Sequence, residues 1–168
     1  MRTDKFTQKT SEALNSAQQL AGSNDQQAVD LSHVVYALVE QDGGVVGPLV
    51  DSIGVERGLL LTKLLALIGK LPKVSGAQPY MASDLDAALR AAQAHADLLN
   101  DDYLSTEHLF LAASDSTCAV GELLRKLGIT NDSILKALEI VRGPHRVTDA
   151  APENRYQALL KYGRDLTA

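Results

Sequence analysis

The amino-acid sequence predicts an all-α fold in which two copies of one helical unit make up most of the chain. The main observation is an apolar run that occurs twice, VDLSHVVYAL at residues 29–38 and LSTEHLFLAA at residues 104–113. His33 and His108 occupy matching places in the two runs, 75 residues apart (108 − 33 = 75). In each run a residue that can cap a helix stands three positions before the histidine, and an apolar stretch follows it. This pattern is typical of the start of a buried helix.

The repeat extends on both sides of this run. Matching residues are 75 positions apart before the run and 74 apart after it: Ala13 and Ala88, Leu14 and Leu89, Ala17 and Ala92, Gly47 and Gly121, Gly54 and Gly128, Leu64 and Leu138, and Gly69 and Gly143. The composition also favours helices, because 45% of the residues are hydrophobic but only 4% are aromatic. The apolar residues are therefore mostly alanine, leucine and valine, which pack closely in helical bundles.

Four helices are expected in the first copy. They run from the N-cap Thr7 to Ala21, from Leu31 to about Gln41, through Pro48 to Ile53, and from Glu56 to Ile68. Asp30 is expected to cap the second of them. The fourth, ERGLLLTKLLALI, is apolar around most of its surface. We therefore expect it to be covered on more than one side, in part by the second copy.

The second copy is expected to contain a matching set. The expected caps are Ser83, Ser105, Thr117 and either Thr130 or Asn131. Ser83 is followed three positions later by Asp86, an N-capping pattern that opens a helix from Asp84 to Leu99. Gly128 and Gly143 are expected to end the last two helices.

The sequence also predicts where the domain ends. We expect one domain over residues 1–143, with repeat one at 1–70 and repeat two at 83–143, joined by an exposed connection, LPKVSGAQPYMA. Residues 144–152 are rich in proline and small polar residues and are expected to be a linker. Residues 153–168 begin a new amphipathic segment, expected to be the start of another domain.

Charge and motif content argue against several functions. The net charge is −5 and the 16 basic residues form no run, so nucleic acid is an unfavourable ligand. The single Gly-Lys pair, Gly69-Lys70, lacks the rest of a phosphate-binding loop, so we expect no nucleotide site in this chain. The sequence has one cysteine, no apolar signal core and no apolar run long enough for a bilayer, which favours a soluble, reducing compartment.

Few residues are candidates for chemistry. His33 and His108 have no second metal ligand at helical spacing, so we expect both to hydrogen-bond across the first helical turn. Cys118 is expected to be a small buried residue. Asp101, Asp102 and Glu107 surround a helix start, where their charge is favourable; the alternative is an acidic rim beside an apolar groove.

Taken together, these residues resemble a known family, the N-terminal domain of the Clp ATPases, and most closely that of the ClpB disaggregases. Both apolar runs match the family's repeated pattern of a capped turn, a histidine and an aliphatic run. LPKVSG at residues 71–76 resembles the family's connection between repeats, and YQALLKYGRDLT at residues 156–167 resembles the approach to its first nucleotide-binding domain.

The resemblance implies an eight-helix, pseudo-twofold domain of two tandem four-helix repeats, on a flexible linker above an ATP-driven homohexameric ring. Such a domain engages exposed apolar segments of unfolded or aggregated proteins and passes them to the ring, in cooperation with the DnaK system. It implies no catalysis and no cofactor in this chain, with ATP and magnesium bound elsewhere in the whole protein. It further implies a monomeric isolated domain, a cytoplasmic location, and neither nucleic-acid nor membrane partners.

The resemblance also implies substrate-binding residues. The family's important threonine, aspartate and glutamate fall on Thr7, Asp101 and Glu107, and a groove-wall leucine falls on Leu89. The other groove-wall position, leucine in some relatives, is His108 here. From the repeat itself we expect a groove at the seam between the two copies, with affinity for flexible segments on the order of micromolar or weaker.

Two alternatives stay open at this point. Domains of the ClpC or ClpA type dock adaptors and, in ClpC, phosphoarginine, using Thr-Glu-His in each repeat. Here the second copy has Thr-Glu-His at residues 106–108, but the first has Leu-Ser-His at residues 31–33, which disfavours a paired site. The other alternative is a small enzyme built on His108 and Cys118, in which alanine at either position would abolish turnover without unfolding the chain.

Overall fold

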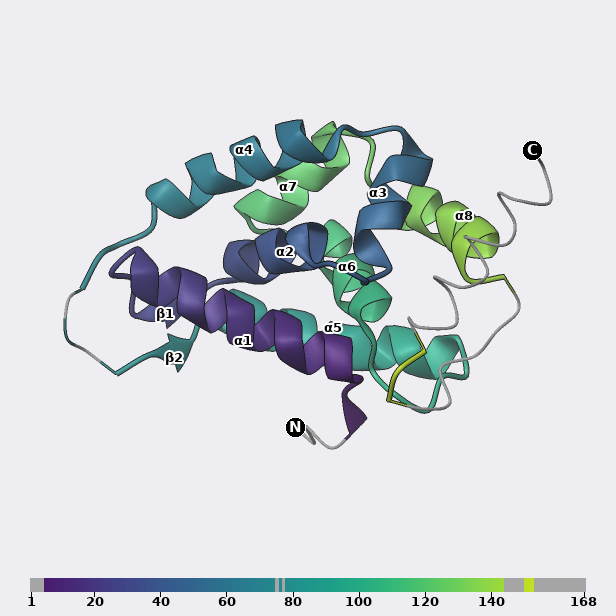
Figure 1. Cartoon of the computed structure of the whole chain (residues 1–168), viewed down its shortest axis with the longest axis horizontal. Coiled ribbons are helices and arrows are strands. Elements are labelled where there is room, and N and C mark those ends of the chain that lie inside the picture. The colour runs from purple at the N-terminus through teal and green to yellow at the C-terminus, as the bar shows by residue number, and fades with distance from the viewer. Residues whose placement is uncertain (1–4, 75, 77, 144–149, 153–168) are drawn as a thin grey trace.

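The computed structural model describes residues 5–74, 76, 78–143 and 150–152, and it confirms the all-α class. The described part contains eight helices and one pair of very short strands (Figure 1). The helices are α1 (Gln8–Ser23), α2 (Leu31–Glu40), α3 (Val46–Ile53), α4 (Arg57–Gly69), α5 (Ser83–Leu98), α6 (Thr106–Asp115), α7 (Ala119–Lys126) and α8 (Asn131–Val141), and the strands are β1 (Ala28–Val29) and β2 (Tyr80–Met81).

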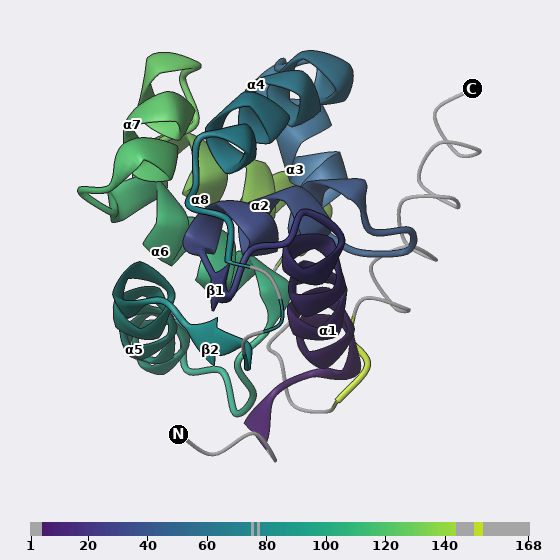
Figure 2. The same ribbon diagram turned by 90° about the vertical axis from the view of Figure 1, so that its left-hand side faces the viewer.

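The two predicted apolar runs form the centre of the molecule as α2 and α6. Eight of the ten residues of α2 and nine of the ten of α6 are buried. Both views show α1 and α5 on one side of this central pair and α3, α4, α7 and α8 on the other (Figures 1 and 2). The burial follows from the sequence, because a helix that is apolar on every side needs neighbours on every side.

The two repeats interlock through backbone pairing. β1 and β2 pair in parallel, with Val29 opposite Met81, and an isolated parallel bridge joins Phe6 to Leu104. These two pairings are equivalent in the repeat, since 6 + 75 = 81 and 29 + 75 = 104. In each case the segment before the first helix of one repeat pairs with the segment before the second helix of the other. Neither repeat therefore completes its own backbone hydrogen bonds.

Thr7 strengthens this interlock at the start of α1. Its side chain caps the helix by accepting a hydrogen bond from the Thr10 amide (3.2 Å), as predicted, and its own amide donates to the Leu104 carbonyl (3.0 Å). The Thr10 hydroxyl donates to the same carbonyl (3.1 Å). The first turn of α1 is thus bonded directly to the other repeat.

The prediction for α4 is wrong in one respect. Only Leu60, Leu64 and Ile68, which share one face of the helix, are buried, while Leu59 and Leu65 are each 45% exposed. The helix lies in an outer layer and packs chiefly on α2, with smaller contacts to α3 and α7. Cover on one side is enough, because a single apolar stripe satisfies the packing of a surface helix.

Two predicted caps are also wrong. α5 begins at Ser83 itself, so Ala82 occupies the N-cap and no side chain caps the helix. The Ala82 amide donates to the Val29 carbonyl (3.0 Å), so pairing with β1 already holds this residue extended. At α7 the N-cap is Cys118 rather than Thr117, and the amide of Cys118 donates to the Ser116 hydroxyl (3.3 Å).

The predicted linker and the segment after it fall mostly outside the described residues, namely at 144–149 and 153–168. Within the described part, the Gln8 amide donates to the Ala150 carbonyl (2.7 Å), and Pro152 is buried. This bond satisfies one of the free amides that every helix start exposes. The domain boundaries remain predictions.

One prediction concerns the glycines that the repeat places in matching helices. A Cβ on Gly121 would lie 2.0 Å from the Ser116 carbonyl oxygen, which is backbone, whereas a Cβ on Gly47 would meet only the movable guanidinium of Arg57. We therefore expect Gly121→Ala to lower the free energy of unfolding by about 3 kcal/mol, measured by urea denaturation.

Gly47→Ala is the matched control. It disturbs an exposed ion pair between Arg57 and Asp51, which contributes about 0–1 kcal/mol, and alanine gains helix propensity of about 1 kcal/mol. We expect a change below about 1 kcal/mol. Equal destabilisation by the two substitutions would contradict the close backbone approach at Gly121.

Candidate functional site

The repeated histidines hold the starts of the two central helices. His33 Nδ1 accepts a hydrogen bond from the Asp30 amide (2.9 Å), and His108 Nδ1 accepts one from the Ser105 amide (2.8 Å). The side chains of Asp30 and Ser105 cap the same turns, so each helix start is a capping box with histidine as its third residue. Both rings are completely buried, which confirms the structural role predicted for them.

The second ring nitrogen of each histidine also has a hydrogen-bond partner. The partner in repeat one was not predicted from the sequence. Because Nδ1 accepts, the proton of the neutral ring is on Nε2, which donates to Gln26 Oε1 from His33 and to Asp101 Oδ2 from His108, both at 2.7 Å. Gln26 and Asp101 are equivalent in the repeat, since 26 + 75 = 101. The same position thus carries an amide in one repeat and a carboxylate in the other.

This difference, together with one at the position equivalent to Ile68, gives the Nε2 atom of His33 a neutral partner and that of His108 a charged one. In repeat one, Gln26 Nε2 donates to the Ile68 carbonyl (2.6 Å), and burial lowers the pKa of His33, an effect that nearby Asp30 only partly offsets. In repeat two, the position equivalent to Ile68 is Arg142 (68 + 74 = 142), whose guanidinium bonds to Asp101 Oδ1. The neutral Ile68 carbonyl of repeat one thus has a buried cation, Arg142, as its counterpart in repeat two.

We call the buried group of Asp101, Ser105, Glu107, His108 and Arg142 the polar cluster. The Ser105 hydroxyl donates to Glu107 Oε1, and Arg142 Nη1 lies 3.6 Å from Glu107 Oε2. All five residues are at most 7% exposed. Among the described residues, two buried carboxylates therefore face one guanidinium and one imidazole, an arrangement that is stable only while the partners stay together.

The structure brings three of the five predicted site residues into this cluster, namely Asp101, Glu107 and His108. Thr7 lies at the start of α1, bonded to the other repeat, and Leu89 lies on the buried face of α5. All five are buried. Asp102, by contrast, is exposed and is the acidic residue next to the cluster that faces solvent. The contact of the five predicted site residues with substrate stays a prediction.

The open surface between the repeats lies elsewhere, over the short strand pair. A hollow of about 200 Å³, which we call the apolar groove, lies between α1 and α5. It is lined by Leu14, Asn15, Gln18, Val29, Pro79, Tyr80, Met81 and Leu85. Tyr80 and Met81 are 55% and 47% exposed. The apolar side chains of the groove are therefore accessible to a partner in the folded domain.

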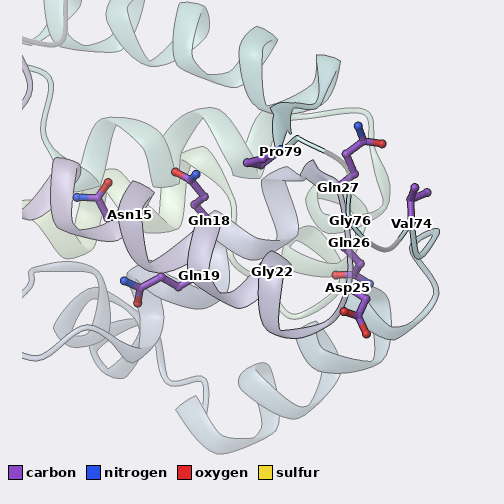
Figure 3. A pocket seen from close by; sticks show the side chains of 10 residues that line it. All are labelled: Asn15, Gln18, Gln19, Gly22, Asp25, Gln26, Gln27, Val74, Gly76 and Pro79. Carbon is purple, nitrogen blue, oxygen red and sulfur yellow. The ribbon is translucent and has the colours of Figure 1, made fainter.

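A wider hollow of about 570 Å³ continues this groove along α1, and we call it the amide groove. Figure 3 shows its lining: Asn15, Gln18, Gln19, Gly22, Asp25, Gln26, Gln27, Val74, Gly76 and Pro79. The two hollows share Asn15, Gln18 and Pro79, so they form one continuous surface. Sequence reasoning missed it, because exposed amides on a helix carry no signal until the strand pair is placed beside them.

Catalytic or metal chemistry finds no support in the described residues. The Cys118 sulfur lies 2.9 Å from the Ser116 hydroxyl, while both ring nitrogens of His108 are bonded to Ser105 and Asp101. The described part of the chain holds no group of three or more His, Cys, Asp or Glu side chains placed to bind a metal ion. Within that same part, no helix has both the length and the apolar character needed to cross a bilayer.

Comparison with known proteins identifies relatives of the whole chain. The Clp repeat (R) N-terminal domain family matches residues 5–127. Chaperone protein ClpB of Bacillus cereus is 40% identical over 173 aligned residues, covering 100% of this chain and 20% of that protein. ClpB of Nitratidesulfovibrio vulgaris is 39% identical, covering 99% and 20%. The chain thus spans about a fifth of the length of these relatives.

Solved structures show the same fold. The Hsp104 N-terminal domain from Candida albicans superposes with a TM-score of 0.78 at 18% identity, covering 89% of this chain and 99% of that one. The N-terminal domain of the ClpV1 ATPase from E. coli superposes with a TM-score of 0.69 at 19% identity, covering 82% and 85%.

The polar cluster generates a stability prediction. Arg142→Met leaves two buried carboxylates without their guanidinium, so we expect the free energy of unfolding to fall by about 3–5 kcal/mol. Adding Asp101→Asn and Glu107→Gln to the same chain imitates the neutral site of repeat one and should restore most of the loss. Urea denaturation of both variants measures this. If the triple variant is less stable than Arg142→Met alone, the charge account of the cluster is wrong.

Proposed function

The chain belongs to the Clp repeat N-terminal domain family, and from this premise we propose that it is the substrate-recognition domain of a ClpB-type disaggregase. In this role it binds exposed apolar segments of unfolded or aggregated proteins and passes them to a hexameric ATPase ring. Identity of 40% to a ClpB chaperone along the whole chain supports this function.

The observation that carries the proposal is the open apolar groove at the contact between the two repeats. Its floor is the strand pair and its walls are α1 and α5, so a bound segment would touch both repeats at once. The exposed Tyr80 and Met81 side chains supply apolar surface that no described residue covers. Unfolded proteins expose such side chains at many points, and a shallow groove of this size suits weak, repeated capture.

We propose that the predicted site residues act on this groove through the fold rather than by touching substrate. Leu89 is equivalent in the repeat to Leu14, which lines the groove (14 + 75 = 89). Thr7 fixes the start of α1 against repeat two, and the polar cluster of Asp101, Glu107 and His108 fixes the start of α6. Substitutions there would then change the position of the groove walls.

A phosphoarginine-docking or adaptor-docking function of the ClpC or ClpA type is the second candidate. Recognition of phosphoarginine needs a carboxylate free to meet the ligand's guanidinium. Glu107 is buried and already faces the guanidinium of Arg142, and the equivalent position in repeat one is Ser32. These contacts favour the disaggregase proposal.

The remaining parts of the proposal concern the whole protein. We place ATP and magnesium binding, the homohexamer and cooperation with the DnaK system outside this chain, which would be a monomer without catalytic activity when isolated. Saturable binding of ATP with magnesium to the isolated chain, measured by calorimetry, would contradict this division.

The groove can be tested with two exposed residues. Tyr80→Ser/Met81→Ser should weaken binding of reduced, carboxymethylated α-lactalbumin about tenfold, because the apolar area that a bound segment would cover is lost, and tenfold corresponds to about 1.4 kcal/mol. Fluorescence anisotropy measures the affinity. The strand pairing uses backbone atoms and should survive, so the melting temperature should stay nearly unchanged.

Leu98→Ser/Ile140→Ser is the matched control, since it removes two apolar side chains that are even more exposed, 79% and 72%, at positions outside the groove. We expect it to bind like the unaltered chain. Equal losses in the two double variants would mean that binding follows general surface hydrophobicity and not the groove.

A further inference from the structure

The amide groove has a row of side chains that are free to bind a partner. Asn15, Gln18 and Gln19 project from α1, are exposed, and lie at helical spacings of three and four (Figure 3). Within the described part of the chain, none of these three amide groups makes a hydrogen bond. Each therefore has donors and an acceptor available for a ligand.

The equivalent positions on α5 are used differently. They are Arg90, Gln93 and Ala94, 75 residues further along. Arg90 forms an ion pair with Asp86 (2.6 Å), and Gln93 donates to Asp97 (3.1 Å), both within the same helix. The free amides are thus a property of repeat one alone, on the side where the apolar groove is open.

A row of free amides suits one kind of ligand, an extended polypeptide. A primary amide presents a donor and an acceptor as a peptide group does, so it can bond to main-chain N–H and C=O of any sequence. Asn15 and Gln19, which are four apart on α1, are separated by about 6 Å along the axis. Alternate residues of an extended chain, whose backbone groups point the same way, are separated by about 6.7 Å. The two spacings nearly match.

The two ends of this surface differ in charge, which would give a bound segment a preferred direction. Asp25 is the one charged residue among those that line the amide groove, and it follows the end of α1, where the helix carries partial negative charge and the last turn has no basic residue. Leu14, at the other end, lines the apolar groove. About 15 Å of helix separates the two positions, a length that about five extended residues span.

We propose that the amide face of α1 binds the main chain of an extended segment, with an apolar side chain of that segment in the apolar groove and a basic side chain near Asp25. This rests on the proposed function, because it names the kind of segment that the domain captures. Main-chain recognition explains how one surface can accept many sequences, and the two end contacts select segments in which apolar and basic residues stand about five apart.

The test uses a capped peptide, Ser-Leu-Ser-Ala-Ser-Ala-Arg-Ser, its reversed sequence, and versions of both with alternate main-chain nitrogens methylated. NMR titration measures the dissociation constants, including weak ones. Gln18→Ala/Gln19→Ala should weaken binding of the unmethylated peptide of the preferred direction about fivefold and binding of its methylated version by a smaller factor, because methylation already removes the main-chain N–H donors to the glutamine oxygens. Asp25→Asn should weaken the arginine peptide about threefold but not a version with glutamine in its place.

Gln93→Ala, at the position equivalent to Gln18, supplies the control on α5 and should leave every dissociation constant unchanged. If the Gln18/Gln19 variant loses the same factor for methylated and unmethylated peptides, or loses nothing, main-chain recognition is wrong, while binding of unfolded protein through Tyr80 and Met81 would still stand. If neither peptides nor unfolded α-lactalbumin bind the unaltered chain, the proposed function itself fails.

Discussion

The parallel pairing that crosses between the repeats is the constraint on which the rest of the structure depends. The backbone before α1 pairs with Leu104, and the backbone before α5 pairs with Val29. Each repeat therefore completes its backbone hydrogen bonds with the other. Buried backbone groups left unpaired would each be costly, which makes separation of the repeats unfavourable. The same pairing sets α1 and α5 on either side of a short strand floor, and the groove is what remains open between them.

The two repeats have diverged in physical character while keeping this frame. Met81, half exposed at the groove, is equivalent to Phe6, which is only 7% exposed. Gln26 and the Ile68 carbonyl, both neutral, are matched by Asp101 and Arg142, both charged. One side of the pseudo-twofold is thus closed over a buried ionic cluster, and the other is open and lined by apolar and amide groups. The two repeats thus share one backbone frame but present different surfaces.

Much of the fold could be predicted because its signals are local. A repeated cap, histidine and apolar run specify a buried helix start, and glycines near helix ends specify where helices stop. What escaped prediction depends on contacts between distant segments. Ser83 was predicted to be an N-cap, but Ala82 takes that position because its amide pairs with Val29. Asp101 bonds to Arg142, which lies 41 residues away in the sequence. Of the site, the histidine role and a groove at the seam were predicted, but the residues that line the groove were not, because the strand pair creates it.

We propose that unfolded polypeptide binds the side of the seam where repeat one is open. The most direct measurement is the change in backbone amide NMR shifts when reduced, carboxymethylated α-lactalbumin is added to the isotope-labelled chain. We expect the largest changes to cluster on the groove lining from Leu14 to Gln19 and from Tyr80 to Leu85. Changes confined to α3, α7 and α8, on the opposite side of the central helix pair, would contradict it.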